Sequence, residues 1–334
     1  MLNLSLIGAG FIGRVHARCI AANPATRLAA VHDLDESAAA AVAERHGARV
    51  AGSVDEIVSC GGTDAVVIAS STDSHGAIAW ACAGAGRPFL CEKPLDTGLA
   101  AALDTVRAVR DAGVFAGIGF NRRFDAQYAA LKRAVDEGEI GRVETMHLTS
   151  RTHALPSLDY VKTSGGQLRD KGSHFFDLAC WIAGERPVEI HVAGACLIEP
   201  RFADYGDVDT AMIILRMKSG ALCHLDFSRR TAYGCDERIE VSGAEGRVES
   251  RHPVPVDVAL YQGATIRRQG LHQHWYERIE DSYPAQLAAF VDALSGSGNG
   301  FPTLVDGLVS EAIAEAGMRS MRENRPVPIA YELD

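Results

Sequence analysis

The chain has 334 residues, which is long enough for two domains of ordinary size. Hydrophobic residues make up 47% of it and charged residues 23%, proportions typical of a globular protein. The formal net charge of −10 argues against a nucleic-acid partner, because binding to a phosphate backbone needs clustered Lys and Arg. An anionic cofactor is not excluded, since backbone amides at a helix N-terminus bind phosphate without a net positive charge.

The sequence also argues against a membrane or secreted protein. No apolar run approaches the ~20 residues that span a bilayer, and the N-terminus lacks the basic start of a signal peptide. The eight cysteines form no Cys-x-x-Cys pair, so we interpret them as reduced thiols and expect a cytoplasmic protein. The twelve histidines show no metal-ligand spacing, and we expect no metal.

The first part of the chain alternates short apolar strands with helices. The expected strands are 4–7, 28–31, 65–69, 88–91 and 115–118. The first strand is followed by a glycine turn and a helix through Ile20, and the second by a helix from Glu36 to about His46. Such alternation is typical of an α/β domain, with a parallel sheet covered on both faces. We assign this domain to residues 1–120.

The regular alternation of strands and helices ends after Phe120. Helices are expected at about 126–137, 175–183, 284–294 and 303–322, and a strand at 143–150. Four further strands, expected to form an antiparallel meander, are 188–197, 210–217, 221–227 and 238–241. Residues 121–334 are therefore predicted to form an α+β domain with a large, mostly antiparallel open sheet.

The glycine turn is the first functional motif. It has the pattern Gly-x-Gly-x-x-Gly, directly after a strand and at the start of a helix. Gly8 permits the tight turn, Gly10 lets the backbone approach a pyrophosphate, and Gly13 allows the helix to pack close to the strand. Phe11 and Ile12 lie at the helix start and complete this predicted dinucleotide site.

Asp33 lies twenty residues after Gly13, at the end of the second strand. A carboxylate there accepts hydrogen bonds from the adenosine ribose and repels a 2′-phosphate, which favours NAD over NADP. The alternative is that Asp33 is the N-cap of the next helix, a place that Asp35 also fits. Ser71 and Thr72 follow the third strand, where they either border the cofactor or cap a helix.

Two further segments carry chemistry. Glu92, Lys93 and Pro94 follow a buried strand, and the carboxyl ends of parallel strands line the ligand crevice. Asp170 and His174 are four residues apart, so on a helix they share one face, and a carboxylate there raises the basicity of the imidazole. Such a pair suits removal of an alcohol proton as hydride leaves carbon, although an isolated Asp/His pair is more commonly a surface ion pair.

Several segments of the chain resemble the Gfo/Idh/MocA oxidoreductases, and among them the inositol 2-dehydrogenases. The segments run in order along nearly the whole chain: GAGFIGRVHA (8–17), CEKPL (91–95), GFNRRFD (119–125), GGQLRDKGSHFFDLACW (165–181), GDVDTA (206–211) and SRRTAYGCDERIE (228–240). Glu-Lys-Pro after a strand is the most specific of these marks.

The resemblance implies a Rossmann domain followed by an α/β domain, residues 121–334, that binds substrate and whose open sheet supports dimers or tetramers. We expect a homotetramer. It implies that Lys93 touches the nicotinamide ribose and the substrate, beside Glu92 at the cofactor. It implies that Asp170 and His174 form the catalytic centre, with the histidine as general base, and that the proline after the lysine is often cis.

Other residues are expected near the substrate with weaker support: Asn121, Arg122, His153, Tyr160 and Tyr233. Surface exposure is the alternative for most of them, and we favour a solvated position for Arg123; His75 is expected to be structural. Two positions depart from the inositol group. Phe175 stands where an acidic residue is common, and Cys235 where tyrosine is common. The loss of polar groups at these positions can shift specificity.

The predicted function is NAD-dependent oxidation of a secondary hydroxyl of a cyclic polyol or sugar, with myo-inositol as the leading candidate. The alternatives on the same fold are a sugar or ketose reductase and an NAD-dependent glycoside-cleaving enzyme. The alternative of another class is a sensor that binds NAD and sugar without turnover. The retained Lys93, Asp170 and His174 argue against the sensor.

Overall fold

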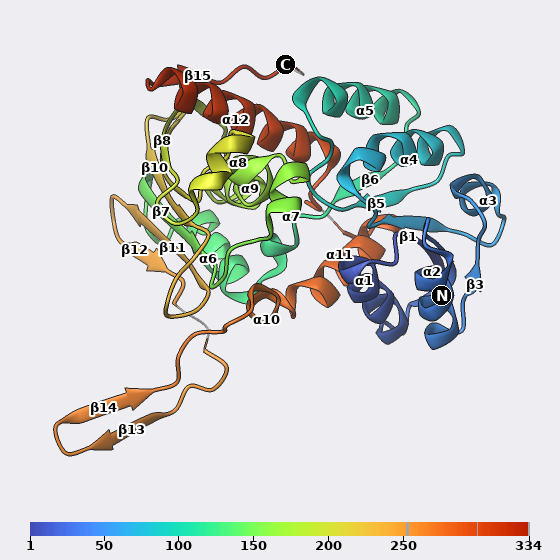
Figure 1. Cartoon of the computed structure of the whole chain (residues 1–334), viewed down its shortest axis with the longest axis horizontal. Coiled ribbons are helices and arrows are strands. Elements are labelled where there is room, and N and C mark those ends of the chain that lie inside the picture. The colour runs from blue at the N-terminus through green and yellow to red at the C-terminus, as the bar shows by residue number, and fades with distance from the viewer. Residues whose placement is uncertain (252–253, 299, 333–334) are drawn as a thin grey trace. The chain divides into compact units, whose positions relative to one another are not determined.

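The computed structural model of the chain describes residues 1–251, 254–298 and 300–332. They form two compact units (Figure 1). The first contains the described residues of 1–124, 281–312 and 331–332, and the second contains those of 125–280 and 313–330. None of the described helices is both long and apolar enough to cross a bilayer.

The first unit is built on a six-stranded parallel sheet with the order β3-β2-β1-β4-β5-β6. The strands are β1 (Leu2–Ile7), β2 (Thr26–His32), β3 (Arg49–Val50), β4 (Ala65–Ile68), β5 (Phe89–Cys91) and β6 (Ala116–Ile118). The strand order reverses between β1 and β4, and ligands of such sheets bind outside the carboxyl ends at this point. The predicted Rossmann-type domain is confirmed.

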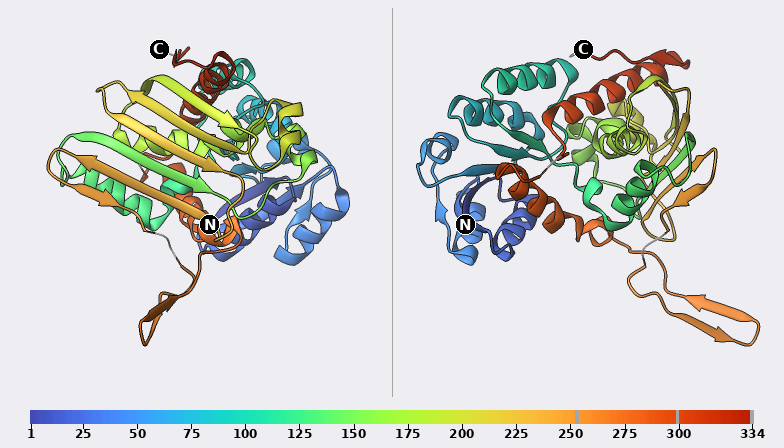
Figure 2. Two further views of the ribbon diagram at one scale, coloured as in Figure 1. Left: turned by 60° about the vertical axis from the view of Figure 1, so that its left-hand side comes forward. Right: turned by 180° about the vertical axis from the view of Figure 1, so that it is seen from behind.

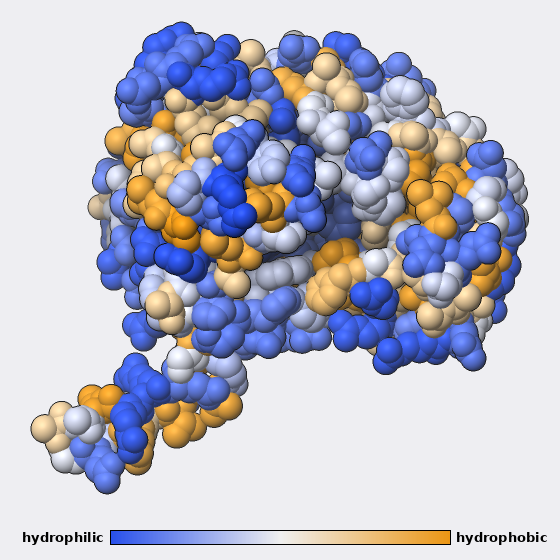
Figure 3. All heavy atoms as spheres, viewed as in Figure 1, coloured by the Kyte–Doolittle hydropathy of each residue, from blue (hydrophilic) through white to orange (hydrophobic). Residues whose placement is uncertain are grey.

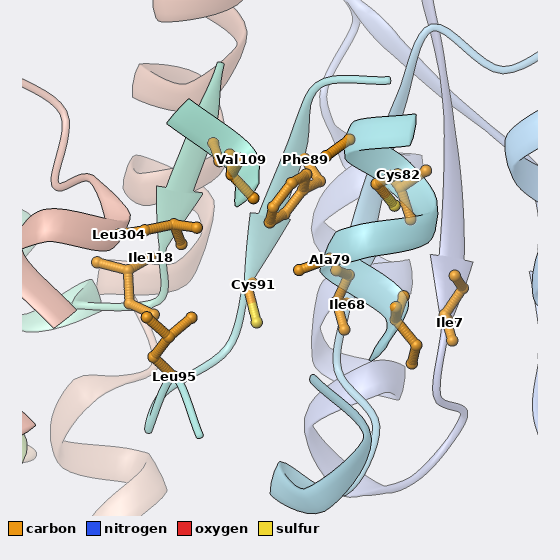
Figure 4. Close-up of a cluster of buried hydrophobic side chains, with 14 of the residues drawn as sticks. Ile7, Ile68, Ala79, Cys82, Phe89, Cys91, Leu95, Val109, Ile118 and Leu304 are labelled. Atoms are coloured by element: carbon orange, nitrogen blue, oxygen red, sulfur yellow. The ribbon is translucent and has the colours of Figure 1, made fainter. Parts of the chain in front are cut away.

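The helices of this unit cover both faces of the sheet: α1 (Phe11–Ala22), α2 (Glu36–His46), α3 (Val54–Ser59), α4 (Thr72–Gly84), α5 (Leu99–Asp111), α11 (Ser282–Leu294) and the start of α12 (Leu304–Glu323). Alternate residues of one strand belong to two separate hydrophobic cores, because successive side chains of a strand point to opposite faces of the sheet. In β4, Ile68 faces the core that α3, α4 and α5 cover (Figure 4). Val66 belongs to the same core, whereas Ala65 and Val67 face α1, α2 and α11.

The boundary between the units differs from the single division expected after residue 120. The chain returns to the first unit with α11, because Leu287, Phe290 and Phe301 complete the core above α1 and α2. Residues 121–124 also belong to this unit, as the short 3-10 helix η1 (Asn121–Phe124). Such a return cannot be read from the local periodicity of α11, which only says that one face is buried.

The second unit contains a seven-stranded sheet with the order β12-β11-β7-β10-β9-β8-β15. The strands are β7 (Val143–Arg151), β8 (Pro187–Ala195), β9 (Thr210–Met217), β10 (Leu222–Ser228), β11 (Asp236–Gly243), β12 (Arg247–Glu249) and β15 (Val327–Pro328). The predicted large, mostly antiparallel sheet is confirmed, with β10 and β7 as a parallel pair. The expected simple meander is wrong, because β7 lies between β10 and β11.

One face of this sheet is covered by helices and the other is not (Figure 2). The helices of the unit are α6 (Ala126–Asp136), α7 (Leu158–Thr163), α8 (Gly166–Asp170), α9 (Gly172–Ala183) and α10 (Trp275–Ile279), with the second half of α12; η2 (Pro200–Tyr205) is a 3-10 helix. Phe175 and Phe176 of α9 pack on Phe227 of β10. On the opposite face Met212, Ile214 and Leu222 remain more than 40% exposed.

A two-stranded hairpin, which we call the arm, extends from the second unit (Figure 1). It consists of β13 (Ala259–Gln262) and β14 (Thr265–Arg268) and was not expected from the sequence. Its apolar side chains, and those of the segment before it, are largely exposed (Figure 3): Val256, Val258, Leu260, Tyr261 and Ile266. An isolated hairpin of this kind is only marginally stable in water.

Replacing Phe290 with alanine tests the return of α11 to the first unit. The side chain is fully buried, and its ring lies 5.9 Å from that of Phe115 and 5.6 Å from that of Phe301. We expect Phe290→Ala to lower the free energy of unfolding by about 3–5 kcal/mol in urea titrations, because a large cavity remains. Ala285→Ser, on the exposed face of α11, is the control. A loss below about 1 kcal/mol would contradict this packing.

Candidate active site

The glycine turn leaves an open cradle at the N-terminus of α1. Gly8 has φ +101°, and a Cβ there would lie 2.4 Å from the carbonyl carbon of Ala69. A Cβ on Gly13 would lie 1.9 Å from the oxygen of Gly8. A Cβ on Gly10 would meet nothing within 4 Å, and Gly10 caps α1 without a side-chain bond. Two glycines therefore permit close backbone packing and the third leaves room at the helix start, which fits a pyrophosphate.

Asp33 lies beside this turn. Its Oδ2 accepts a hydrogen bond from the backbone N–H of Ala9 at 2.6 Å, and its Oδ1 accepts one from that of Asp35 at 2.8 Å. The N-cap of α2 is Asp35, whose side chain accepts from the backbone of Ser37 and Ala38. The alternative that Asp33 is the N-cap is therefore wrong. The carboxylate instead joins the end of β2 to the glycine turn, where the ribose of a bound dinucleotide is expected.

The segment after β5 is held on both sides of Lys93. Oε1 of Glu92 lies 2.7 Å from Nε2 of His16, and Oε2 accepts from the backbone N–H of Lys93 at 3.2 Å. The peptide bond between Lys93 and Pro94 is cis. The carbonyl of Pro94 lies 2.9 Å from Nδ1 of His75. We expect Glu92 at the cofactor. In the structure both of its carboxylate oxygens contact protein groups, so its position is fixed by His16 and by the backbone of Lys93.

Ser71 and Thr72 lie at the next strand end, after β4. Ser71 is the N-cap of α4, yet its side chain makes no capping bond, and Thr72 is the first helical residue. The capping alternative for the Ser71 side chain is therefore not supported. Ala69 of the same loop packs against Gly8, so this loop runs beside the glycine turn. Both residues remain candidates for the edge of the cofactor site.

Asp170 and His174 lie where two short helices meet. Asp170 ends α8, and His174 is in the first turn of α9. Lys171 between them has helical angles, φ −81° and ψ −44°, so a spacing of four places the two side chains on one face. Gly172 begins α9 and packs closely on Phe176, where a Cβ would lie 2.8 Å from the ring. The glycine therefore serves close packing and does not break the helical path.

A polar network fixes the Asp170 carboxylate. The hydroxyl of Tyr160 donates to Oδ1 of Asp170 at 2.9 Å, and Nη1 of Arg229 lies 3.9 Å from Oδ2. Desolvation of the Tyr160 hydroxyl, followed by the negative charge of Asp170, raises the pKa of this tyrosine. Nη2 of Arg229 also binds Asp207 at 3.0 Å, and both of these side chains are buried. Tyr160 was expected near the site, and Arg229 and Asp207 were missed.

Lys171 attaches this helical junction to the sheet. Its Nζ donates to the carbonyl of Ser228 at 2.7 Å and to that of Ser150 at 3.2 Å. These residues lie near the carboxyl ends of β10 and β7, which are paired in parallel. The position of Asp170 and His174 is therefore set by backbone groups of two strands. Lys171, Asp207 and Arg229 lie in the segments 165–181, 206–211 and 228–240, respectively. Membership of these family-like segments was the only indication in the sequence that they lie near the site.

The other expected site residues are placed as follows. Asn121 is buried and donates to Oγ of Ser282 at 2.9 Å; Arg122 is also buried. Nδ1 of His153 lies 3.2 Å from the carbonyl of Thr231. The solvated position favoured for Arg123 is wrong, because its side chain is only 9% exposed and binds Asp306 at 2.8 Å.

Tyr233 lies with charged residues of the sheet. Its hydroxyl donates to Oδ2 of Asp236 at 3.1 Å and accepts from Nη1 of Arg151 at 3.4 Å. Desolvation and then the nearby charge of Asp236 raise the pKa of the Tyr233 hydroxyl. About half of the residue, 49%, is exposed. The side chain thus has protein partners while part of its surface stays open to solvent.

The two unusual positions have different surroundings. Phe175 is fully buried, and its ring packs edge-on against Phe227 at 5.6 Å. Cys235 is 5% exposed, and its backbone N–H donates to the carbonyl of His272 at 2.7 Å. Burial raises the pKa of the Cys235 thiol. Both residues are therefore buried and contribute to packing in the second unit.

The two units match the two halves of one family. Residues 2–120 match the oxidoreductase family model described as an NAD-binding Rossmann fold, and residues 128–249 match the GFO/IDH/MocA C-terminal domain. The chain belongs to the GFO/IDH/MocA oxidoreductase family. It is an NAD-binding oxidoreductase, in agreement with the cradle at α1 and the carboxylate of Asp33.

The chain is similar over its whole length to named members of this family. It is 37% identical to an inositol 2-dehydrogenase of Rhizobium meliloti, over 98% of this chain and 99% of that protein. It is 36% identical to a myo-inositol 2-dehydrogenase of Thermotoga maritima, over 98% of each. The solved structure of a myo-inositol dehydrogenase from Corynebacterium glutamicum is 31% identical and superposes with a TM-score of 0.94, over 99% of each chain.

Replacing Asp33 tests the cofactor preference. Asp33→Asn keeps an oxygen for the N–H of Ala9 but removes the charge that repels a 2′-phosphate. We expect the ratio of kcat/KM for NAD over NADP to fall by about 10- to 100-fold, the size of one charge-assisted hydrogen bond. Asp35→Ala is the control, because it removes the cap of α2 and should leave this ratio unchanged. An unchanged ratio in Asp33→Asn would contradict the assignment.

Proposed function

We propose that the chain oxidises a secondary hydroxyl group of an inositol to the ketone, with NAD as hydride acceptor. The observation that carries the proposal is identity of 36–37%, over nearly the full length, with inositol dehydrogenases. The candidate chemistry supports it, because an aspartate and a histidine share one face of a helical junction. Myo-inositol is the first substrate to test.

His174 and Asp170 are the proposed proton-transfer pair. His174 is buried, so that a proton on its ring is sheltered from bulk water. It takes the proton of the hydroxyl group that is oxidised, while Asp170 orients and charges the imidazole. Tyr160 and Arg229 hold the Asp170 carboxylate in place. The pair thereby supplies a base in a fixed orientation.

Lys93 is the proposed electrostatic partner of the hydroxyl oxygen. Its ammonium group stabilises negative charge on the oxygen as the proton leaves, and it also binds the nicotinamide ribose. When bound, NAD supplies the carbon that accepts the hydride. Gly8, Gly10, Phe11, Ile12, Gly13 and Asp33, with Ser71, Thr72 and Glu92, are proposed to surround NAD. Asn121, Arg122, His153, Tyr160 and Tyr233 are proposed to surround the polyol.

Replacing His174 tests this mechanism. We expect His174→Ala to lower kcat by about 10²- to 10⁴-fold, the usual contribution of a general base, with little change in NAD affinity. The initial rate of NADH formation and a fluorescence titration with NAD measure the two quantities. His46→Ala, at the end of α2, is the control and should keep full turnover.

A set of inositols, aldoses and ketoses tests the substrate class with the same assay. We expect the highest kcat/KM for an inositol. Turnover of a linear sugar alone would contradict the proposed substrate, and binding of polyol and NAD without NADH formation would contradict the proposed reaction. Near-normal kcat in His174→Ala would contradict the role of this residue.

We further propose that the protein is a cytoplasmic homotetramer. The eight free cysteines support a reducing compartment. The uncovered face of the seven-stranded sheet and the arm are two separate surfaces with exposed apolar residues. Two different twofold contacts are what a tetramer of dihedral symmetry needs. Burial of both surfaces between copies would also stabilise the arm.

Replacing Ile214 tests this assembly. Ile214 is 42% exposed on the uncovered sheet face, in register with His224 of β10. We expect Ile214→Asp to reduce the tetramer to a smaller species in sedimentation velocity, because the charge would be buried against another copy. Val50→Asp, which is also exposed but on β3 of the first unit, is the control. A monomeric wild-type protein, or an unchanged mass in Ile214→Asp, would contradict the proposed interface.

A further inference from the structure

Two buried histidines from different helices hold the residues on either side of Lys93. His16 lies on α1 and contacts Glu92, and His75 lies on α4 and contacts Pro94. Each histidine is 1% exposed. The lysine thus lies between two neighbours whose polar groups are both fixed by buried rings, one from each face of the sheet.

The contact on the Glu92 side is tightly enclosed. Nε2 of His16 lies 2.7 Å from Oε1 of Glu92, and the other oxygen accepts from the N–H of Lys93. A Cβ on Gly119 would lie 2.7 Å from Oε2 of Glu92, so only glycine leaves room for the carboxylate. Glu92 therefore connects His16 of α1 to the backbone N–H of Lys93.

The contact on the Pro94 side is equally confined. Nδ1 of His75 lies 2.9 Å from the carbonyl of Pro94, and Nε2 lies 3.3 Å from that of Ser70, at the end of β4. Burial lowers the pKa of His75, which favours the neutral ring, and a neutral ring can donate to only one of these carbonyls, of which that of Pro94 is the nearer. A Cβ on Gly76 would lie 2.7 Å from Oδ2 of Asp96, so α4 packs directly on the same loop. The loop therefore has little room to move away from α4.

A histidine is an unfavourable residue for position 16 if it serves only to fill space. Nδ1 of His16 is buried and makes no hydrogen bond within the part of the chain that the structure describes. The ring otherwise packs edge-on against Tyr283, at 5.7 Å. An apolar side chain would fill this place without an unsatisfied buried nitrogen. The bond to Glu92 is the feature that such a side chain would lose.

We propose that His16 and His75 are positioning residues for Lys93, which fix its backbone and thereby place its ammonium group against the hydroxyl that is oxidised. The inference rests on the proposed function of Lys93. Neither histidine touches the reacting atoms in the proposed mechanism. Errors of about 1 Å in the placement of a catalytic group can cost about 100-fold in rate, which is why a fixed backbone matters here.

Matched substitutions separate positioning from packing. His16→Leu and His75→Leu fill the space but remove the hydrogen bonds, whereas His16→Gln and His75→Asn retain a donor near Nε2 and Nδ1, respectively. We expect the Leu variants to lose about 10- to 100-fold in kcat with the polyol, and any loss of NAD affinity to be smaller than this loss. The Gln and Asn variants should recover most of this loss. Ile20→Ala, a buried change on α1, controls for reduced stability.

A double-mutant cycle with Lys93→Ala tests whether the histidines act through the lysine. If they do, His16→Leu lowers kcat/KM in the wild type but has no further effect in the Lys93→Ala background. Equal losses in both backgrounds, or full activity of the Leu variants, would overturn the inference. If Lys93→Ala itself retains wild-type turnover, the proposed function of Lys93 fails instead, so the two failures are distinguishable.

Discussion

The first unit depends on the direct packing of one backbone turn against another. A side chain on Gly8 would overlap the backbone of Ala69, and one on Gly13 would overlap the oxygen of Gly8. This contact brings the ends of β1 and β4 together at the point where the strand order reverses. Asp33 is then within hydrogen-bonding distance of the turn. The open start of α1, the position of the Asp33 carboxylate and the loop with Ser71 all follow from this one close approach.

The second unit places its polar residues by a different device. Lys171 donates to backbone carbonyls near the ends of β7 and β10, and the helical path through it carries Asp170 and His174. The carboxylate of Asp170 is further held by Tyr160 and Arg229. An ammonium group in contact with two carbonyls satisfies buried acceptors that would otherwise be costly. Fold and candidate chemistry are thus linked through main-chain groups of the sheet.

The features that the sequence predicts well are those with a local signal. The glycine turn, the strand before it and Asp33 all lie within about thirty residues of one another. Asp170 and His174 are four residues apart, and this spacing is sufficient to place them on one face of a helical path. The strands expected at 210–217 and 221–227 are separated by only three residues, and β9 and β10 form an antiparallel pair. In each of these cases neighbours in sequence are neighbours in space.

The missed features depend on partners that are distant in sequence. The insertion of β7 between β10 and β11 leaves no local trace, because every strand of the sheet alternates in the same way. The same holds for α11, whose buried face meets α1 more than 250 residues earlier in the chain. Arg123 was assigned to solvent because its partner, Asp306, lies 183 residues away. Buried charge pairs of this kind appear only once the fold brings them together.

The transfer of deuterium from the polyol to the cofactor tests the central claim most directly. The enzyme would be incubated with NAD and myo-inositol deuterated at its ring carbons, and the reduced nicotinamide analysed by mass spectrometry and NMR. We expect one deuterium at C4 of each reduced nicotinamide, on a single face of the ring. Reduced nicotinamide without deuterium, or loss of the label to solvent, would contradict a direct hydride transfer from inositol to NAD.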